Sequence, residues 1–319
     1  MSLSDAARPN NPASADIVER LCAGDPGALA RCISVMETGG RAADYIHRRI
    51  VAKTGRATVI GFTGAPGAGK STLIDAMIAA LRAQGHTVAV AAVDPSSPVF
   101  GGAILGDRVR MRRHAEDPGV FIRSVASRGH LGGLSESIHR IVDVMDAAGR
   151  EVVILETVGT GQSEVEVFEI ADVCVVVNAP NMGDDVQAMK AGVLEIADVL
   201  VVNKADLPLA QRTTDQLRDM LKLRHDKRDV PIIETVAIKD TGVDTLLAAI
   251  EKLLAARAGD RQKARERRMR RLIAQAASRL LHDRLRNHPG EEVQHLITAA
   301  AAGDIGIAEA AEKALKIIC

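Results

Sequence analysis

The sequence contains very few aromatic side chains: no tryptophan, one tyrosine and four phenylalanines among 319 residues. Proteins that bind single-stranded nucleic acid stack successive bases on aromatic side chains, so the composition argues against that class. The 41 basic and 41 acidic residues cancel to a net charge of zero, which disfavours binding to nucleic acid through bulk charge. Nucleic acid is therefore not an expected partner.

Long apolar segments and cysteine pairs are also missing. No window approaches the ~18 uninterrupted apolar residues of a membrane-spanning helix, so no membrane contact is expected. The first residues are polar and lack the apolar core of a secretory signal. The four cysteines are scattered without a CxxC pair, which excludes a cysteine-based zinc ribbon and favours a cytoplasmic location.

The apolar residues that are present, 47 % of the chain, are arranged in short runs rich in valine and isoleucine. Continuous apolar runs are typical of strands buried on both faces, as in parallel sheets. Longer amphipathic segments separate them, and two of these end at Gly85 and Gly149, as helices often do. The sequence therefore predicts an α/β domain with a mostly parallel sheet flanked by helices. The predicted strands are 58–62, 88–93, 120–122, 152–155, 173–177, 199–202 and 231–236.

Helical extensions are expected on both sides of this domain, which we place at residues 56–255. Residues 1–55 form the N-terminal extension, in which Asp25 and Pro26 resemble an N-cap followed by proline at the first helical position. Within 256–319, the segment 257–271 is strongly basic. This pattern is typical either of a solvated helix face or of a surface that binds an anionic partner. A single helical arm buries little surface by itself, so we expect this arm to dock on another subunit and form a homodimer.

The most specific motif follows the first predicted strand and reads GxxxxGK[ST], the P-loop. Its glycines allow backbone N–H groups to converge on phosphate oxygens, and the next helix directs its positive end at the same charge. We expect Lys70 to contact the β- and γ-phosphates and the Ser71 hydroxyl to bind Mg²⁺. The predicted phosphate site comprises Gly64, Ala65, Pro66, Gly67, Ala68, Gly69, Lys70, Ser71 and Thr72.

A second motif, Asn203-Lys204-Ala205-Asp206, reads NKxD and follows the predicted strand 199–202. A carboxylate at Asp206 can accept from the N1–H and the 2-amino group of guanine, a donor pair that adenine lacks. Lys204 can lay its aliphatic stem along the base, and Asn203 can brace the P-loop. The motif therefore favours GTP and GDP over ATP. After the next strand, the backbone of Ala237, Ile238 and Lys239 is expected to bind the guanine oxygen.

Three acidic residues lie at strand ends or in loops expected at the nucleotide edge of the sheet: Asp94, Asp107 and Glu156. Mg²⁺ is usually held by one or two carboxylates together with waters and phosphate oxygens. We predict that each of these carboxylates is linked to the metal. The alternative is an ordinary carboxylate that is solvated or caps a helix.

Together with the NKxD motif, Asp94-Pro95-Ser96-Ser97, the glycine-rich stretch 101–107 and the run ETVGTGQSE at 156–164 resemble the MeaB/ArgK-type GTPases. The resemblance covers about residues 16–258. The tail that follows resembles the family only in being helical. These GTPases are chaperones of adenosylcobalamin-dependent acyl-CoA mutases, chiefly methylmalonyl-CoA mutase, within a wider group of P-loop GTPases that includes metal-insertion chaperones. The resemblance implies a homodimer with a C-terminal arm, and Mg²⁺ held by Ser71 with Asp94, Asp107 and Glu156 around it.

The resemblance also implies switch loops at about 95–113, 156–169 and 179–190, through which the nucleotide gates cofactor loading or ejection at the mutase. In the third, Asn181 and Met182 depart from the usual PGxGD-like run. No glutamine follows a DxxG motif, so we expect slow basal hydrolysis that the partner accelerates. The expected stabilising charges are Arg108, Arg110 and Lys190, which join Lys70, Asp107 and Glu156 as candidate catalytic residues; Asp184, Asp185 and Gln187 complete the third loop.

Three alternatives remain open. A nickel-insertion GTPase usually carries His-rich tracts or Cys pairs, whereas the nine histidines here are dispersed. An ArgK-like ATPase or kinase conflicts with the NKxD motif. A scaffold that binds GTP without turnover is compatible with the sequence. The chain also lacks a DxHxxG-type cobalamin motif, so we expect the corrinoid to bind to the mutase.

Overall fold

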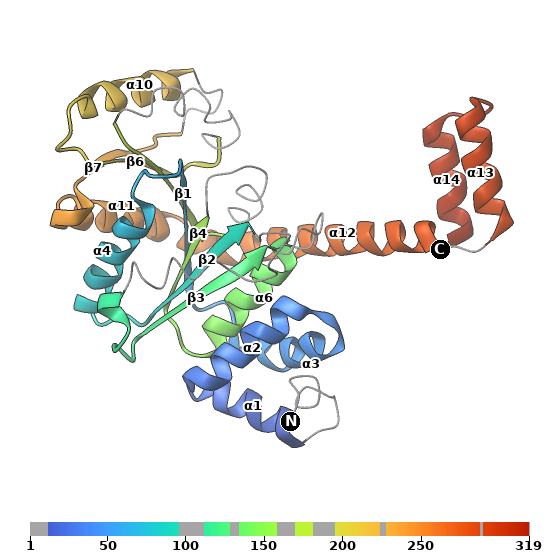
Figure 1. The fold of residues 1–319 in the computed structure, drawn as a ribbon, viewed down its shortest axis with the longest axis horizontal. Coiled ribbons are helices and arrows are strands. Elements are labelled where there is room, and N and C mark those ends of the chain that lie inside the picture. The colour runs from blue at the N-terminus through green and yellow to red at the C-terminus, as the bar shows by residue number, and fades with distance from the viewer. Residues whose placement is uncertain are drawn as a thin grey trace. The chain divides into compact units, whose positions relative to one another are not determined.

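The computed structural model describes residues 12–95, 112–127, 134–157, 170–180, 195–223, 228–287 and 290–318. The chain divides into two compact units, Met1–Arg261 and Gln262–Cys319. Figure 1 gives the order of their helices and strands along the chain. Whether the predicted boundaries at 55/56 and 255/256 separate functional domains stays a prediction.

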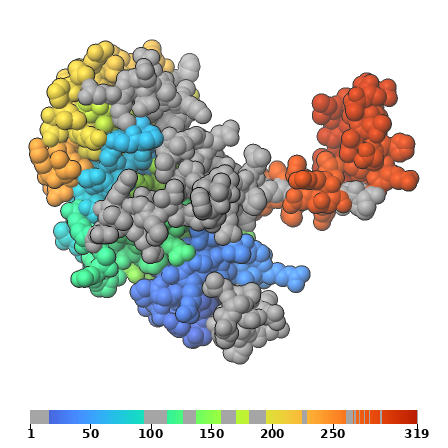
Figure 2. Space-filling model, viewed as in Figure 1, coloured from blue at the N-terminus to red at the C-terminus, as the bar shows by residue number. Residues whose placement is uncertain are grey.

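The first unit begins with three helices: α1 (Pro12–Cys22), α2 (Pro26–Thr38) and α3 (Gly40–Ile50). The Asp25 side chain accepts a hydrogen bond of 2.7 Å from the Ala28 amide at the start of α2, and Pro26 occupies the first turn. The expected N-cap is therefore present. Apolar side chains of all three helices join a core that also includes one face of the sheet. In the space-filling view the N-terminal helices (blue) lie directly against the green segment of β3 and α6 (Figure 2).

Seven strands within the described residues form one sheet in which every pair is parallel, in the order β3-β2-β4-β1-β5-β6-β7. Their continuous apolar runs are buried, as expected for a sheet covered on both faces. The strands are β1 (Thr58–Gly64), β2 (Val88–Pro95), β3 (Val120–Ser127), β4 (Val152–Thr157), β5 (Val173–Asn178), β6 (Val199–Asn203) and β7 (Ile232–Thr235).

Helices cover both faces of this sheet. On one face, α4 (Lys70–Ala83) and α11 (Val243–Ala256) pack on β1, β4, β5 and their neighbours. On the other face lie α1 to α3 together with α6 (Leu134–Ala147), and α10 (Ala210–Lys222) packs on β6. The short 3-10 turns η1 (Val51–Lys53), η2 (Arg112–His114), η3 (Ala237–Lys239) and η4 (Ala258–Asp260) connect elements. The predicted α/β architecture with helical extensions is confirmed.

The second unit is helical and contains most of α12 (Arg261–Asn287), followed by α13 (Glu291–Ala302) and α14 (Ile307–Ile318). α13 ends at Gly303, whose φ of +83° suits glycine, and the chain then turns back into α14. The Arg284 guanidinium donates to the Ile318 carbonyl at 3.1 Å and so ties the end of α14 to α12. Among the described helices, none combines the length and apolar character needed to span a bilayer.

Candidate functional site

The P-loop motif forms the turn between β1 and α4, at the carboxyl edge of the sheet. Gly67 and Gly69 have φ values of +80° and +90°, a region that favours glycine. Gly64 also lies at positive φ, and a Cβ on it would collide with the backbone carbonyl of Val177 on β5. The neighbouring strand therefore leaves no room for a side chain at the first position of the motif.

Lys70, the first residue of α4, is buried although it carries an ammonium group. Its Nζ donates to the backbone carbonyls of Gly64 at 2.8 Å and Ala65 at 3.1 Å. The charge is thus held inside the loop formed by the motif, beside the N-terminus of α4. Because cations and helix N-termini both attract anions, this end of the loop is suited to phosphate.

Ser71 and Glu156 meet between α4 and the end of β4. The Ser71 hydroxyl donates to Glu156 Oε1 at 2.7 Å, and both residues are buried. Glu156 lies opposite Phe62 of β1 and Ala92 of β2 in the register of the sheet. Mg²⁺ binds hydroxyl and carboxylate oxygens, so the side chains of these two residues fit the predicted metal ion.

Asn203 connects the phosphate loop to the loop after β7. Its side-chain amide donates to the Ala68 carbonyl at 3.0 Å, while its Oδ1 accepts from the Thr235 hydroxyl and the Ala237 amide, both at 3.1 Å. The residue is 2 % exposed. An amide offers donors and an acceptor at once, so Asn203 satisfies both loops and fixes their separation.

Lys204 and Asp206 lie on the same rim, where they are exposed. Lys204, at a φ of +56°, donates from Nζ to the Gly67 carbonyl at 2.8 Å. Asp206 Oδ2 accepts from the Lys239 ammonium at 3.0 Å. This hydrogen bond holds the pKa of the Asp206 carboxyl below its usual value. Asp206 is therefore an accessible, ionised acceptor, as recognition of the guanine N1–H requires.

The structure thus brings most of the predicted nucleotide-binding residues to one edge of the sheet. Of the remainder, Thr72 is exposed on α4, Ala237 is buried, and Ile238 is 78 % exposed. Asp94 lies near the end of β2, opposite Ala126 of β3, and its side chain is not described. The predicted residues Asp107, Arg108, Arg110 and Lys190 lie outside the described residues, as do most of the three predicted switch loops.

Sequence reasoning missed two contacts at this site. The Thr235 hydroxyl donates to Asn203 and holds it in place, and the available signal was a hydroxyl residue just before the segment 237–239 that was expected to bind the guanine oxygen. Asp75 lies on α4 four residues after Ser71 and pairs with Arg113 and His114. No motif marks those residues, since the pairing depends on how the chain folds. Nowhere in the described part of the chain, this site included, do three His, Cys, Asp or Glu side chains group together as a metal site built only from such residues would require.

Comparison with known proteins identifies the relatives of this chain. The family model described as methylmalonyl Co-A mutase-associated GTPase MeaB matches residues 29–289. A Pyrococcus abyssi protein classed as a GTPase is 42 % identical over 311 residues, covering 95 % of this chain and 96 % of the relative. GTPase ArgK of Escherichia coli is 37 % identical over 251 residues, or 76 % of each chain.

Two further matches extend the comparison to an animal protein and to a solved structure. The mitochondrial methylmalonic aciduria type A homolog of Caenorhabditis briggsae is 34 % identical over 244 residues, 71 % of this chain and 59 % of that protein. The crystal structure of a LAO/AO transport system kinase superimposes with a TM-score of 0.73 at 25 % identity, covering 97 % of this chain and 98 % of the other. With a P-loop, an NKxD motif and the family model along most of its length, this chain belongs to the MeaB family of P-loop GTPases.

Proposed function

We propose that this chain hydrolyses GTP to GDP and phosphate with Mg²⁺, and that it serves as a chaperone for an adenosylcobalamin-dependent acyl-CoA mutase of the methylmalonyl-CoA mutase type. The observation that carries the GTPase part is Asn203, which joins the phosphate loop to the loop after β7 through buried hydrogen bonds. The two halves of a guanine-nucleotide site are thereby held at a fixed separation.

In this proposal the P-loop backbone and Lys70 bind the β- and γ-phosphates. Lys70 now donates to two loop carbonyls, so nucleotide binding exchanges those bonds for stronger charge-assisted bonds to phosphate. Ser71 and Glu156 hold Mg²⁺ or its waters, with Asp94 and Asp107 as further candidates. A bound Mg²⁺ would neutralise charge on the phosphate oxygens. Arg108, Arg110 and Lys190 stay candidates for the charge that accelerates hydrolysis in the complex.

Base recognition is assigned to the rim formed by Lys204, Asp206 and the loop after β7. Asp206 accepts from the N1–H and 2-amino groups of guanine, and Lys204 covers the base with its stem. The backbone of Ala237, Ile238 and Lys239 faces the guanine oxygen. Adenine would leave the Asp206 carboxylate without its donors, and rejection of that kind is strong.

The partner part of the proposal rests on the family. Its model is described as methylmalonyl Co-A mutase-associated, and the related Caenorhabditis briggsae protein is named after methylmalonic aciduria. We propose that GTP binding and hydrolysis switch the loops that face the mutase and so gate loading, protection or reactivation of its cofactor. A homodimer assembled through residues 256–319 completes this proposal.

The decisive experiment is a calorimetric titration of wild type, Asp206→Asn and Asp215→Asn with GTP and with ATP in the presence of Mg²⁺. Asp215 is the matched control, an exposed aspartate that pairs with Arg218 on α10. We expect wild type and the control to prefer GTP strongly, and Asp206→Asn to lose most of that preference. Equal binding of ATP and GTP by wild type would contradict the guanine assignment and favour an ArgK-like ATPase or kinase.

The chaperone role needs a separate test, since a GTP-binding scaffold would pass the titration. Single-turnover GTP hydrolysis should be measured with and without a purified adenosylcobalamin-dependent acyl-CoA mutase. Acceleration by the mutase is expected because a partner can supply an ordered charge or order one in the chain. Hydrolysis that is unchanged by every mutase tested, with no complex on co-purification, would refute the partner assignment and leave the GTPase assignment intact.

A further inference from the structure

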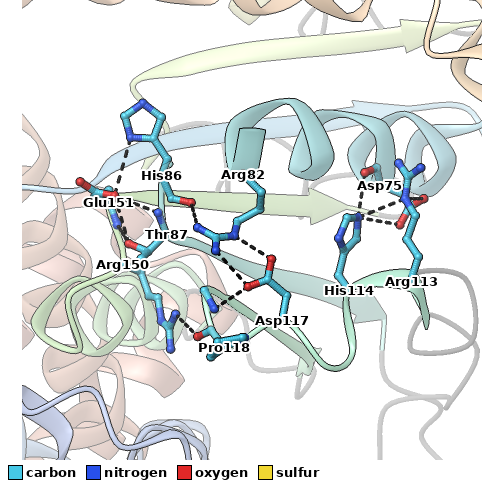
Figure 3. A network of polar contacts seen from close by, with 11 residues as sticks. Asp75, Arg82, His86, Thr87, Arg113, His114, Asp117, Pro118, Arg150 and Glu151 are labelled. Carbon is cyan, nitrogen blue, oxygen red and sulfur yellow. Dashed lines mark hydrogen bonds and ion pairs between the residues drawn. The ribbon is translucent and has the colours of Figure 1, made fainter. Parts of the chain in front are cut away.

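The segment 112–119 connects the end of predicted switch I to β3 and is held on α4 at two separate points. Figure 3 shows both: Asp75 with Arg113 and His114 at one point, and Arg82 with Asp117 at the other. α4 is the helix that starts at Lys70 and Ser71. One helix therefore carries the phosphate-binding residues and both attachments of this segment.

The first attachment is a compact cluster around Asp75. The Arg113 Nε atom lies 2.6 Å from Asp75 Oδ2, and the His114 Nε2 atom lies 3.2 Å from Oδ1 and 3.1 Å from the Asp75 backbone carbonyl. The side chains of Asp75 and His114 are only 15 % and 8 % exposed. Partial burial strengthens the attraction between these charges and also removes water from the Asp75 carboxylate, so the buried carboxylate depends on its two partners.

The second attachment is a two-bond ion pair at the far end of α4. Arg82 donates from Nε to Asp117 Oδ2 at 2.8 Å and from a terminal nitrogen to Oδ1 at 3.0 Å. The same guanidinium donates to the His86 carbonyl at 2.7 Å, and Asp117 also accepts from the Gly119 amide. These bonds fix the start of β3 against the end of the helix.

The two attachments differ in their distance from the phosphate site. Asp75 follows Ser71 by four residues and thus lies about one helical turn away on the same side of α4. Arg82 lies two further turns along the helix. A substitution at Asp75 therefore alters the structure next to the predicted phosphate and Mg²⁺ residues. A substitution at Asp117 acts mainly at the C-terminal end of α4, away from those residues.

Charges around Asp75 agree with a role beyond local packing. Burial raises the pKa of its carboxyl, and the charges of Arg113 and His114 oppose that shift. Asp240, directly after the loop predicted to bind the guanine oxygen, adds to the rise. Arg113 and His114 are thus the groups that favour the ionised form of Asp75.

We propose that Asp75 is a positioning residue that fixes the C-terminal end of switch I to the P-loop helix and thereby increases the affinity for GTP relative to GDP. The inference rests on the proposed guanine-nucleotide function. A switch loop contacts the γ-phosphate and its Mg²⁺ only in the GTP state, so the entropy of ordering it opposes GTP binding alone. A loop whose end is already fixed loses less entropy on ordering, which favours GTP and leaves GDP unaffected.

The test measures affinities for GDP and for a non-hydrolysable GTP analogue, with Mg²⁺, for wild type, Asp75→Asn and Asp117→Asn. Both substitutions keep the side-chain size and each removes the charge of one attachment. We expect Asp75→Asn to weaken binding of the analogue about tenfold while the GDP affinity changes by less than about twofold. Asp117→Asn should leave the ratio of the two affinities unchanged, even if it lowers the melting temperature.

Equal loss of affinity for both nucleotides in Asp75→Asn, or the same change of ratio in both variants, would show a merely structural attachment and overturn the proposal. If Asp75→Asn does not fold, Arg113→Gln carries the test, since the Arg113 side chain is 45 % exposed. In a double-mutant cycle, Asp75→Asn and Arg113→Gln should be non-additive in the affinity ratio. A wild type with no preference for guanine would instead mark the failure of the proposed function.

Discussion

Carboxylates at the two edges of the sheet have different kinds of partner. At the amino edge, Asp146 accepts from the amides of residues 55, 56 and 57, Asp172 from the Val59 amide, and Asp198 from the Cys174 amide. At the carboxyl edge, Glu156 accepts from a serine hydroxyl and Asp206 from a lysine ammonium. Every carboxylate of the first set accepts from backbone amides, and Asp198 pairs with the Arg257 guanidinium as well, whereas the two bonds of the second set come from side chains.

This difference separates structural from functional carboxylates. A backbone amide cannot move away without local unfolding of the chain, so a carboxylate bonded to it contributes to stability. A hydroxyl or ammonium on a side chain can rotate away and be replaced by a metal ion or a base. The partner of a carboxylate is therefore a better guide to its role than its burial, since Asp198 and Glu156 are both buried.

The largest effect is expected at the amino edge. Asp198→Ala removes the acceptor for the Cys174 amide and the carboxylate partner of Arg257, whose guanidinium keeps its bond to the Asp172 carbonyl. We expect a loss of about 3–4 kcal/mol of unfolding free energy. Denaturant unfolding measures it, and the variant that remains folded should keep the nucleotide preference of wild type. A changed GTP-to-ATP ratio would break the comparison.

The converse is expected for Ser71→Ala at the carboxyl edge. Loss of the hydroxyl removes a predicted Mg²⁺ ligand, so single-turnover GTP hydrolysis should fall by about 100-fold. The unfolding free energy should fall by no more than about 1.5 kcal/mol, since one hydrogen bond is lost. Thr38→Ala, which removes an exposed hydroxyl bonded to the Ser34 carbonyl on α2, is the control and should change neither quantity. A loss of stability as large as that of Asp198→Ala would place Ser71 with the structural set.

Asn203 belongs to both classes, because its partners are two loop backbones and the Thr235 hydroxyl. Asn203→Ala should cost about 2 kcal/mol of unfolding free energy, because buried groups lose their partners. It should also weaken GTP binding about tenfold, since the two loops are no longer held together. Chemical unfolding and calorimetry measure the two effects. If only stability changes, Asn203 is a structural residue like Asp198.

The smallest effect concerns pH and sharpens the assignment of Asp206. Lys239 lowers the pKa of Asp206, so its removal raises that pKa and the carboxylate becomes protonated at higher pH. As the pH is lowered from about 6 to 4, Lys239→Ala should therefore lose guanine selectivity at a higher pH than wild type does. The measurement is the affinity for GDP at each pH. The control is Lys222→Ala, which removes a lysine paired with Asp219 on α10. Identical pH profiles for all three proteins would contradict the coupling.

The sequence predicted the sheet well because buried parallel strands leave continuous apolar runs. It predicted β3 as 120–122, whereas the strand continues to Ser127. The reason is that β3 is an edge strand, where Arg123 interrupts the apolar run and pairs with Glu37 of α2. Polar residues of an edge strand are not distinguishable from a loop by periodicity alone.

The candidate site was predictable where a residue lies inside a compact motif, as Lys70, Ser71 and Asn203 do. The pairs Asp75–Arg113 and Asp206–Lys239 were not predictable, because each joins side chains more than 30 residues apart whose meeting depends on helix and loop packing. Glu156 was predictable as an acid after a buried strand. Its contact with Ser71 was not predictable, because it depends on the register in which β4 pairs with β1.

One close approach at the P-loop limits how this protein can diversify. A Cβ on Gly69 would collide with the side-chain amide of Asn203, the first residue of the NKxD motif. A side chain at position 69 would thus displace the amide with which Asn203 braces the phosphate loop. During evolution such a side chain is consequently expected only together with a change at Asn203.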